Sequence, residues 1–242
     1  MNAIDTEALT KDYGSKRALD SLTLSVHDGE LFALLGVNGA GKTTAIKLLS
    51  GLMKPTSGTA TIYGHDILTE SHQARSLLST SPQETAVAPN LTARENLELM
   101  AGIYGATGKE AKEKATELIQ RFNLSSIEKT KAKKLSGGWQ RRLSIAMALI
   151  SQPKLLFLDE PTLGLDILAR RELWTIIRAL KGKTTIILTT HYLEEAEALS
   201  DRIGILAQGK LTALGTASEL MEKSGTENFE DAFISLAGGV IE

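Results

Sequence analysis

The fold is decided by one stretch of the sequence, Leu31-Phe32-Ala33-Leu34-Leu35-Gly36-Val37-Asn38-Gly39-Ala40-Gly41-Lys42-Thr43. Its first five residues are all apolar, which is typical of a strand covered on both faces of a sheet. The remainder matches the phosphate-loop pattern of Gly, four residues and Gly-Lys-Thr, placed directly before a helical pattern. In such a loop the glycines let successive N–H groups turn towards phosphates, and the lysine reaches the β and γ phosphates. The stretch therefore predicts a nucleotide site at the carboxyl end of a buried strand.

Further apolar runs predict the rest of the sheet. Residues 155–158 and 185–188 are continuous in the same way as residues 31–35, and each run is followed by a helical pattern. This order predicts an α/β fold around a largely parallel sheet, with ligands at the carboxyl ends of its strands. Alternating apolar residues near 22–26 and 59–63, bounded by Gly-containing turns, predict two strands that pair in an antiparallel β region near the N-terminus.

A helical insertion interrupts this α/β order between residues 84 and 150. Thr92 with Glu95, and Thr107 with Glu110, have the spacing of capping boxes that open helices. A third helix is expected over residues 137–150. We therefore expect one domain over residues 1–242. Residues 1–84 and 151–242 form the α/β core with its β region, and residues 85–150 form the helical subdomain.

Composition excludes several classes of function. The chain has 242 residues, of which 42% are hydrophobic, and its formal charge is −2 with a pI near 6.1, so no global attraction to nucleic acid or anionic lipid is expected. The absence of cysteine excludes disulfides, thiolate metal sites and cysteine nucleophiles. The N-terminus lacks the regions of a signal peptide, and no apolar run approaches the roughly 18 residues that span a bilayer. We expect a soluble, cytoplasmic chain.

Two carboxylates, Asp159 and Glu160, follow the buried run at residues 155–158. An isolated pair would merely mark where a strand reaches the surface. Beside a phosphate loop, the Mg²⁺ of the nucleotide supplies the charge that they need. Asp159 is expected to hold Mg²⁺ through its water shell, with the Thr43 hydroxyl as a ligand, and Glu160 is the candidate general base for an attacking water.

Three further residues are candidates because of their places along the chain. His191 follows the run that ends at Thr190, so it is expected at the same sheet edge, near a γ-phosphate, although an isolated histidine there is often a helix cap. Gln83 lies where the sheet gives way to the insertion. It is either an ordinary turn residue or a ligand of Mg²⁺ and water. Tyr13 precedes a Gly turn and either packs locally or stacks on adenine.

A second phosphate grip is predicted at Leu135-Ser136-Gly137-Gly138-Trp139, where the third helix begins. A Ser-Gly-Gly at a helix start offers exposed backbone N–H groups and a hydroxyl. These groups suit a phosphate that is already held elsewhere.

In this order, the motifs resemble those of the nucleotide-binding subunit of ATP-binding cassette (ABC) transporters, over essentially the whole chain. Tyr13 matches the A-loop of that family and Gln83 its Q-loop. Residues 135–139 match the signature sequence, residues 155–160 the Walker B motif, residues 163–166 the D-loop, and His191 the switch histidine. The Walker A match, residues 36–44, carries most of the expected ATP contacts, through Gly36, Asn38, Gly39, Ala40, Gly41, Lys42, Thr43 and Thr44.

The resemblance implies a P-loop NTPase (RecA-like) core that binds ATP and Mg²⁺. Glu160, His191 and Gln83 are the implied catalytic residues, and Thr43, Gln83 and Asp159 the implied metal ligands. It also implies a head-to-tail dimer with a second copy or a homologous ATPase subunit. Ser136, Gly137, Gly138 and the D-loop residue Asp166 would then contact ATP, with Ser136 and the two glycines reaching the ATP held by the partner.

The resemblance further implies separate transmembrane permease subunits, which would place the chain on the inner face of the cell membrane. The compact length is similar to that of the ATPases of export-type permeases. The competing interpretation is a soluble cassette ATPase that acts on ribosomes, translation factors or DNA. Those proteins usually carry two cassettes or a long coiled coil, whereas only about fifty residues separate Gln83 from Leu135. No nucleic acid partner is therefore expected.

Two residues depart from the common family pattern. Trp139 stands where Gln is usual, and Leu163 stands where the D-loop often has Ser. Trp139 is expected either to pack at the dimer interface or to cover the helix start. We expect altered packing at these positions and retained ATPase activity.

Overall fold

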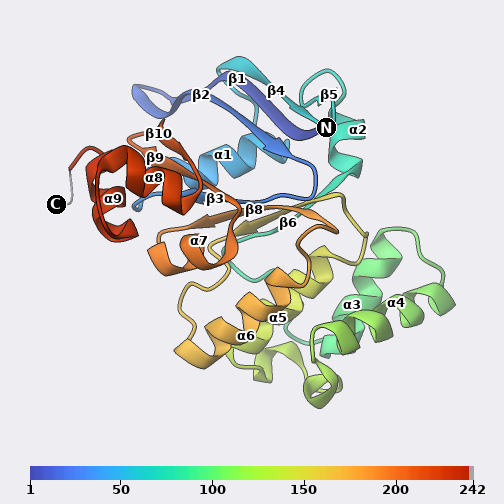
Figure 1. The fold of residues 1–242 in the computed structure, drawn as a ribbon. Helices are drawn as coiled ribbons and strands as arrows, with labels where there is room; N and C mark the ends of the chain where they lie inside the picture. The colour runs from blue at the N-terminus through green and yellow to red at the C-terminus, as the bar shows by residue number, and fades with distance from the viewer. Residues whose placement is uncertain (240–242) are drawn as a thin grey trace.

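The protein is described here by a computed structural model of residues 1–239, so the expected domain boundary at residue 242 lies outside the described residues. Two sheets and a set of helices form the molecule (Figure 1). Along residues 1–239, every helix is too short or too polar to cross a membrane.

The N-terminal sheet is antiparallel and has the strand order β2-β1-β4-β5. Its strands are β1 (Asn2–Tyr13), β2 (Lys16–His27), β4 (Ser57–Ile62) and β5 (His65–Asp66). The two predicted strands lie in this sheet as expected, but they do not pair with each other. β1 runs between them and pairs with both.

The second sheet has the order β10-β9-β3-β8-β7-β6. Its parallel strands are β6 (Leu78–Ser81), β7 (Leu155–Asp159), β8 (Thr185–Thr190), β3 (Leu31–Leu35) and β9 (Arg202–Ala207), and β10 (Lys210–Gly215) joins β9 antiparallel. Every residue of β3, β7 and β8 is buried. The predicted parallel sheet with ligand-binding carboxyl ends is therefore present.

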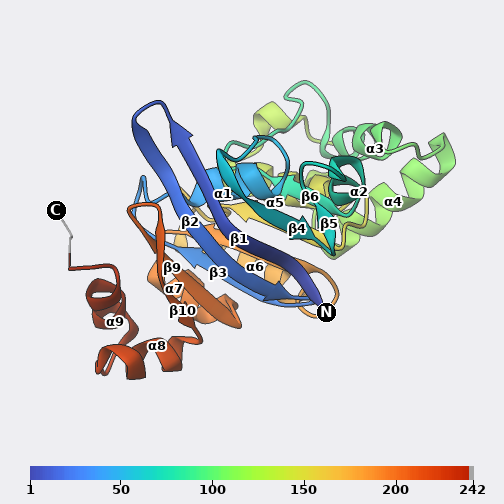
Figure 2. The same cartoon turned by 90° about the horizontal axis from the view of Figure 1, so that it is seen from above.

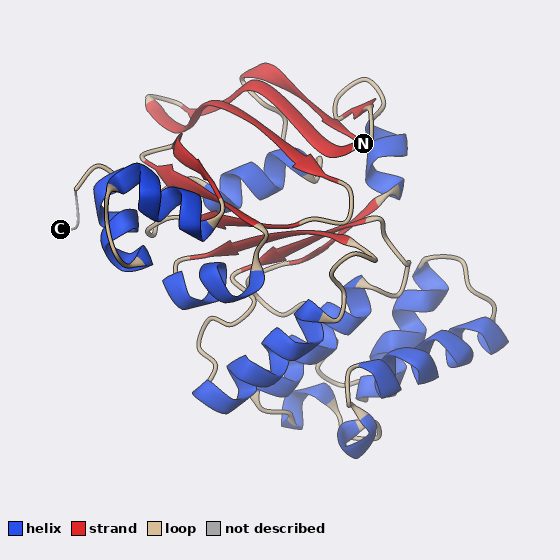
Figure 3. Ribbon diagram, in the orientation of Figure 1, coloured by secondary structure: helices blue, strands red, loops and turns tan. Residues whose placement is uncertain are grey.

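Helices cover both faces of this sheet. α1 (Lys42–Leu49) lies between the two sheets (Figures 1 and 3), where Ile46 and Leu48 share a hydrophobic core with Leu9 of β1 and Phe157 of β7. On the other face, α5 (Gly137–Ala148), α6 (Ile167–Arg178) and α7 (Leu193–Leu199) cover the strands. The C-terminal pair α8 (Ala217–Ser224) and α9 (Phe229–Leu236) packs against β3, β9 and β10.

The insertion consists of helices joined by loops and short 3-10 turns. After the short α2 (Ser71–Ser76) and β6, the helices α3 (Ala93–Ile103) and α4 (Gly108–Arg121) lie side by side (Figures 1 and 2). Both predicted capping boxes form, at Thr92 with Glu95 and at Thr107 with Glu110. Two short 3-10 turns, Ser125–Ile127 and Ala132–Lys134, lead into α5. α5 ends at Ala148, before the predicted limit at residue 150, because its last turn tightens, with the Ile150 N–H donating to the Met147 carbonyl three residues back.

Candidate nucleotide site

A cavity of about 490 Å³ opens at the carboxyl ends of β3, β7 and β8. It brings together most of the predicted site residues, from segments far apart in the chain. Its lining consists of Tyr13, Lys16, Ala18, Asn38, Gly39, Ala40, Gly41, Lys42, Thr43, Thr44, Gln83, Glu160, Leu163 and His191. Gly36 lies beneath it, buried at the end of β3.

The phosphate loop is tightly fitted at two glycines. A Cβ at Gly36 would lie 2.4 Å from the Leu206 carbonyl oxygen, and a Cβ at Gly41 would lie 2.5 Å from the Ala18 carbonyl oxygen. Gly41 also has a φ of 110°, a backbone conformation that side chains disfavour. The sequence therefore needs glycine at both positions to let α1 start directly behind the loop.

Lys42 is a buried cation at the centre of the site. Its Nζ donates to the Gly36 carbonyl at 2.7 Å and to the Val37 carbonyl at 3.2 Å, and it lies 3.2 Å from Glu160 Oε1. Because only 6% of the Lys42 side chain is exposed, its charge is weakly screened. This cation is well placed to attract a phosphate entering the cavity.

Oxygen ligands for a hard cation lie beside the loop. The Thr43 hydroxyl lies 3.4 Å from Asp159 Oδ1, which also accepts a 2.5 Å hydrogen bond from the Thr189 hydroxyl. This pair of a hydroxyl and a carboxylate fits Mg²⁺, which prefers oxygen. Residues 1–239 contain no cluster of three or more His, Asp or Glu that would hold a metal. A bound Mg²⁺ would therefore need phosphate oxygens and water to complete its shell.

Glu160 is held by both neighbours expected to act with it. Its Oε1 faces Lys42, and its Oε2 lies 2.5 Å from His191 Nδ1. Its backbone N–H donates to the Thr189 carbonyl at 3.1 Å. Its φ of 50° lies in the left-handed region, which is uncommon for a non-glycine residue and is found at sites under functional constraint. The turn aims the carboxylate at the phosphate loop.

Tyr13 and Gln83 both line the cavity and are exposed. The Tyr13 ring is exposed at the end of β1, and its hydroxyl donates to Met53 Sδ at 2.9 Å. The Gln83 side chain is exposed towards the cavity, whereas its backbone carbonyl accepts a hydrogen bond from the guanidinium of Arg141 on α5.

The signature residues do not line this cavity. Ser136 is the exposed N-cap of α5 and makes no capping hydrogen bond with its side chain. A Cβ at Gly137 would meet no atom within 4 Å, so the helix start is open to an approaching molecule. Asp166 is exposed and caps α6, accepting from the Ala169 N–H at 2.9 Å. Within one chain, this carboxylate serves α6 and lies outside the cavity.

Comparison with known proteins decides the family. The model of the family described as "ABC transporter" matches residues 19–163, which is more than half of the chain. The chain belongs to the ABC transporter family. It is an ATP-binding subunit with ATPase activity, as its motifs imply.

Relatives and solved structures agree over nearly the whole chain. A daunorubicin/doxorubicin resistance ATP-binding protein of Streptomyces peucetius is 44% identical over 93% of this chain and 68% of its own length. A solved ATP-binding subunit of an ABC transporter superposes with a TM-score of 0.85 at 31% identity, covering 97% of this chain and 99% of its own. A dimeric ATP-binding cassette in a post-hydrolysis state with ADP and Pi superposes with a TM-score of 0.79 at 26% identity, covering 88% and 98%.

The ABC ATPase contains site residues that its motifs did not predict. Lys16 and Ala18 line the cavity from the start of β2, and the Thr189 hydroxyl on the neighbouring strand β8 donates to Asp159. The sequence points to Thr189 only through its place in a strand that is expected beside the strand of Asp159. Leu163 also lines the cavity, so this departure from the family pattern lies within the site.

Trp139 packs within its own subunit of the ABC ATPase. Its ring contacts the core below α5, and the Arg142 guanidinium lies 4.5 Å from the ring centroid. Arg142 also pairs with Glu172 of α6. This geometry fits the expected cover over the helix start, and the packing of Trp139 at a dimer interface stays a prediction.

Two buried ionisable groups lie behind the site. Burial lowers the pKa of the Arg141 guanidinium below its ordinary value. Burial also raises the pKa of the Glu195 carboxyl, whose Oε1 accepts from Trp174 Nε1 at 3.0 Å. Glu195 therefore keeps its proton to a higher pH than an exposed carboxyl.

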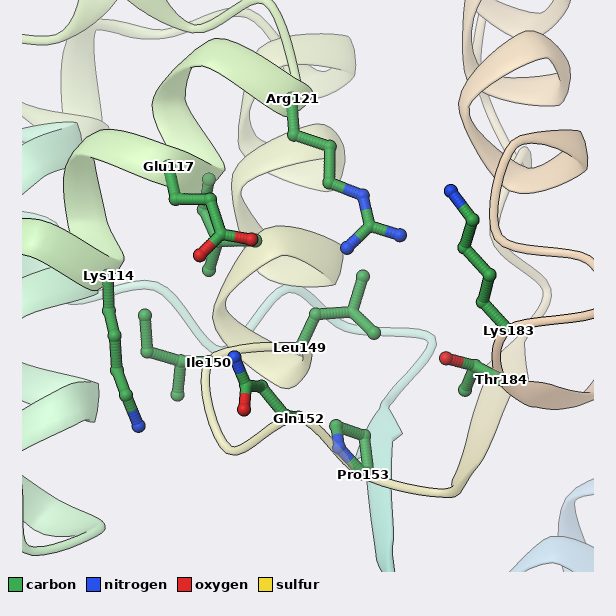
Figure 4. A pocket seen from close by; sticks show the side chains of 10 residues that line it. Lys114, Glu117, Arg121, Leu149, Ile150, Gln152, Pro153, Lys183 and Thr184 are labelled. Atoms are coloured by element: carbon green, nitrogen blue, oxygen red, sulfur yellow. The ribbon is translucent and has the colours of Figure 1, made fainter.

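A second cavity of about 250 Å³ lies at the opposite edge of the sheet (Figure 4). Gln152, Pro153, Lys183 and Thr184, which precede β7 and β8, line one side of it, and Arg121 reaches in from α4. Ligands of open α/β sheets bind at the carboxyl ends of the strands. The first cavity is therefore the nucleotide site of the ABC ATPase.

Proposed function

We propose that this ABC ATPase works as a head-to-tail dimer that closes on two Mg²⁺-bound ATP molecules and drives export through separate membrane subunits. One observation carries the proposal. The phosphate-loop lysine, the Glu160 carboxylate and His191 share one cavity, whereas Ser136 and the start of α5 stand exposed outside it. A second copy supplies the phosphate that this exposed grip needs.

The predicted site residues have separate proposed roles. The loop amides and Lys42 bind the phosphates, and Thr43 with Asp159 hold Mg²⁺, which neutralises charge on the phosphate oxygens when bound. Glu160 accepts a proton from the attacking water, and His191 keeps the Glu160 carboxylate oriented through Nδ1. Gln83 contributes its side-chain oxygen to metal and water, and the exposed face of Tyr13 stacks on adenine.

The shared site can be tested by mixing two defective subunits. Ser136→Arg blocks the grip, and Lys42→Ala removes the phosphate contact. Each homodimer then has two defective sites, but the heterodimer has one intact composite site. We expect ATPase activity to return on mixing, to about half of the wild-type rate per heterodimer.

The heterodimer content is measured with two affinity tags, and a mixture of wild-type and doubly substituted chains serves as the control. Heterodimers that form but stay inactive would show that Ser136 acts within its own subunit.

The proposed docking site of the permease is a groove of about 320 Å³ between the sheet and α3. It includes Pro82, directly beside Gln83, so an occupant lies next to the nucleotide cavity. Leu52 and Tyr104 on its rim are 72% and 51% exposed, which suits burial under an apolar partner segment. The proposed occupant is a cytoplasmic segment of a transmembrane subunit, and the chain then lies at the inner face of the membrane.

Export is the direction favoured by the relatives named for drug resistance, and an apolar drug-like molecule is the proposed class of cargo. The competing role on ribosomes or DNA has no long coiled coil to support it, since α4, the longest helix of the described insertion, has 14 residues.

Copurification tests this partner directly. We expect the tagged chain to retain a multi-span membrane protein in mild detergent and Tyr104→Asp to lose it, because burying a carboxylate in an apolar contact is unfavourable. The control Leu68→Asp changes a similarly exposed residue outside the groove. Recovery of ribosomes or DNA in place of a membrane protein would overturn the transport role.

A further inference from the structure

Arg141 is a buried cation with an unusual set of partners. It lies on α5, five residues after Ser136, and only 4% of the residue is exposed. Along residues 1–239 its guanidinium forms no salt bridge with an acidic side chain. Its hydrogen bonds go instead to two backbone carbonyls, Pro82 at 2.6 Å and Gln83. A buried charge is costly unless its donors are satisfied, so these two bonds hold the loop firmly against α5.

The same loop contacts α5 on both sides of Arg141. The Ser81 hydroxyl lies 3.3 Å from the Ser144 hydroxyl, and the Thr85 hydroxyl donates to Gln140 Oε1 at 3.4 Å. Residues 81–85 therefore run along α5 from Ser144 to Gln140. The contact with the charged Arg141 lies between the other two. The Gln83 side chain is left exposed on the cavity.

The charges around Arg141 favour this arrangement. The buried Asp159 carboxylate attracts the guanidinium, and Glu195, which is also buried, does so only when it is ionised. Along residues 1–239, the hydrogen bonds of the Arg141 guanidinium go to backbone carbonyls and not to either carboxyl group. The donors remain directed at the loop.

We propose that Arg141 is the positioning residue of Gln83. It fastens the Gln83 backbone to the helix that starts at Ser136, so the orientation of α5 sets where the Gln83 amide lies in the nucleotide cavity. The catalytic consequence rests on the proposed role of Gln83, whereas the mechanical link can be measured without turnover.

Arg142 provides a matched control. It is the next residue on the same helix and is similarly buried, but its guanidinium contacts Glu172 and the Trp139 ring. Arg142→Lys therefore perturbs packing at α5 without touching the loop. Arg141→Lys keeps the charge but loses the planar fork that reaches two carbonyls.

The link is measured with a nitroxide spin label at Glu84→Cys. The label is unique because the chain has no cysteine, and position 84 is exposed. We expect Arg141→Lys to narrow the lines of the label, which reports a loosened loop, and Arg142→Lys to leave them unchanged. Equal spectra for all three proteins would overturn the proposal, as would equal narrowing by both substitutions.

A double-mutant cycle tests the catalytic consequence. We expect Arg141→Lys to lower kcat on the order of tenfold with little change in KM for ATP, because misplacement costs the transition state more than binding. In a Gln83→Ala background the same substitution should have almost no further effect. The cycle is run below the melting temperature of each variant, and Arg142→Lys should be additive with Gln83→Ala.

The outcomes separate the two claims. If Gln83→Ala leaves kcat unchanged while the label loosens, the proposed role of Gln83 fails and the link stands. If Gln83→Ala lowers kcat and Arg141→Lys adds its full effect to it, Arg141 acts only on folding or elsewhere, and the proposal is wrong.

Discussion

Glu160→Gln keeps ATP binding and loses hydrolysis by a factor on the order of 10² to 10⁴, the usual contribution of a general base. The amide matches the carboxylate in shape, so its contacts with His191 and the loop are largely retained. It cannot accept the proton of the attacking water. Phosphate release and equilibrium binding of labelled ATP, measured on the same preparation, check both halves of this result.

The matched control is Glu194→Gln, an exposed glutamate in the first turn of α7. It should hydrolyse ATP at the wild-type rate. Turnover of Glu160→Gln within about threefold of wild type, which corresponds to less than 1 kcal/mol, would remove Glu160 from the role of base.

Lys42→Ala should raise the Kd for ATP by about ten- to a hundredfold and abolish most turnover. The lost contact is a charge-assisted hydrogen bond to phosphate from a buried cation, which is worth about 1.5 to 3 kcal/mol. The substitution also leaves Glu160 without its cation partner at 3.2 Å. The lost contact weakens the binding of the ATP phosphates, and the unpaired Glu160 carboxylate disfavours binding and hydrolysis. Calorimetric titration with ATP, followed by steady-state kinetics, measures the two effects.

Lys47→Ala is the control for this change, because Lys47 lies in the last turn of the same helix and is exposed. It should bind ATP as the wild type does. Unchanged affinity and turnover in Lys42→Ala would mean that the phosphates are held elsewhere.

The features that could be predicted from the sequence are those encoded over short distances. Residues 31–43 contain a buried strand, a tight loop and a helix start in one continuous stretch. Capping boxes such as Thr92 with Glu95 likewise depend on residues three apart. The parallel sheet could be predicted because each of its central strands contains a continuous apolar run and is buried along its length.

β1 was missed for a physical reason. Its register shifts between Thr6 and Leu9, and Ala8 has a φ of 48°, so the alternation of inward and outward residues is broken. The sequence pattern therefore shows no continuous period of two. The strand is stabilised by pairing with β2 and β4, which a local pattern does not encode.

The unpredicted site residues depend on contacts between distant segments. In the sequence, Arg141 cannot be distinguished from any other arginine on a helix. Its partners, the backbone carbonyls of Pro82 and Gln83, are brought to it by the fold. Lys16 and Ala18 line the cavity because the start of β2 lies close to the phosphate loop, at Gly41. Asp166 was predicted from its motif alone. In one chain it caps α6, and its contact with nucleotide stays a prediction for the dimer.

Native mass spectrometry of Glu160→Gln with ATP and Mg²⁺ tests the central claim most directly. That claim is that two chains close on two ATP molecules, each gripped by Lys42 of one chain and by Ser136 of the other. The account predicts a species with the mass of two chains and two ATP molecules, which disappears with ADP. A single chain carrying one ATP at every protein concentration, with no dimer, would contradict it.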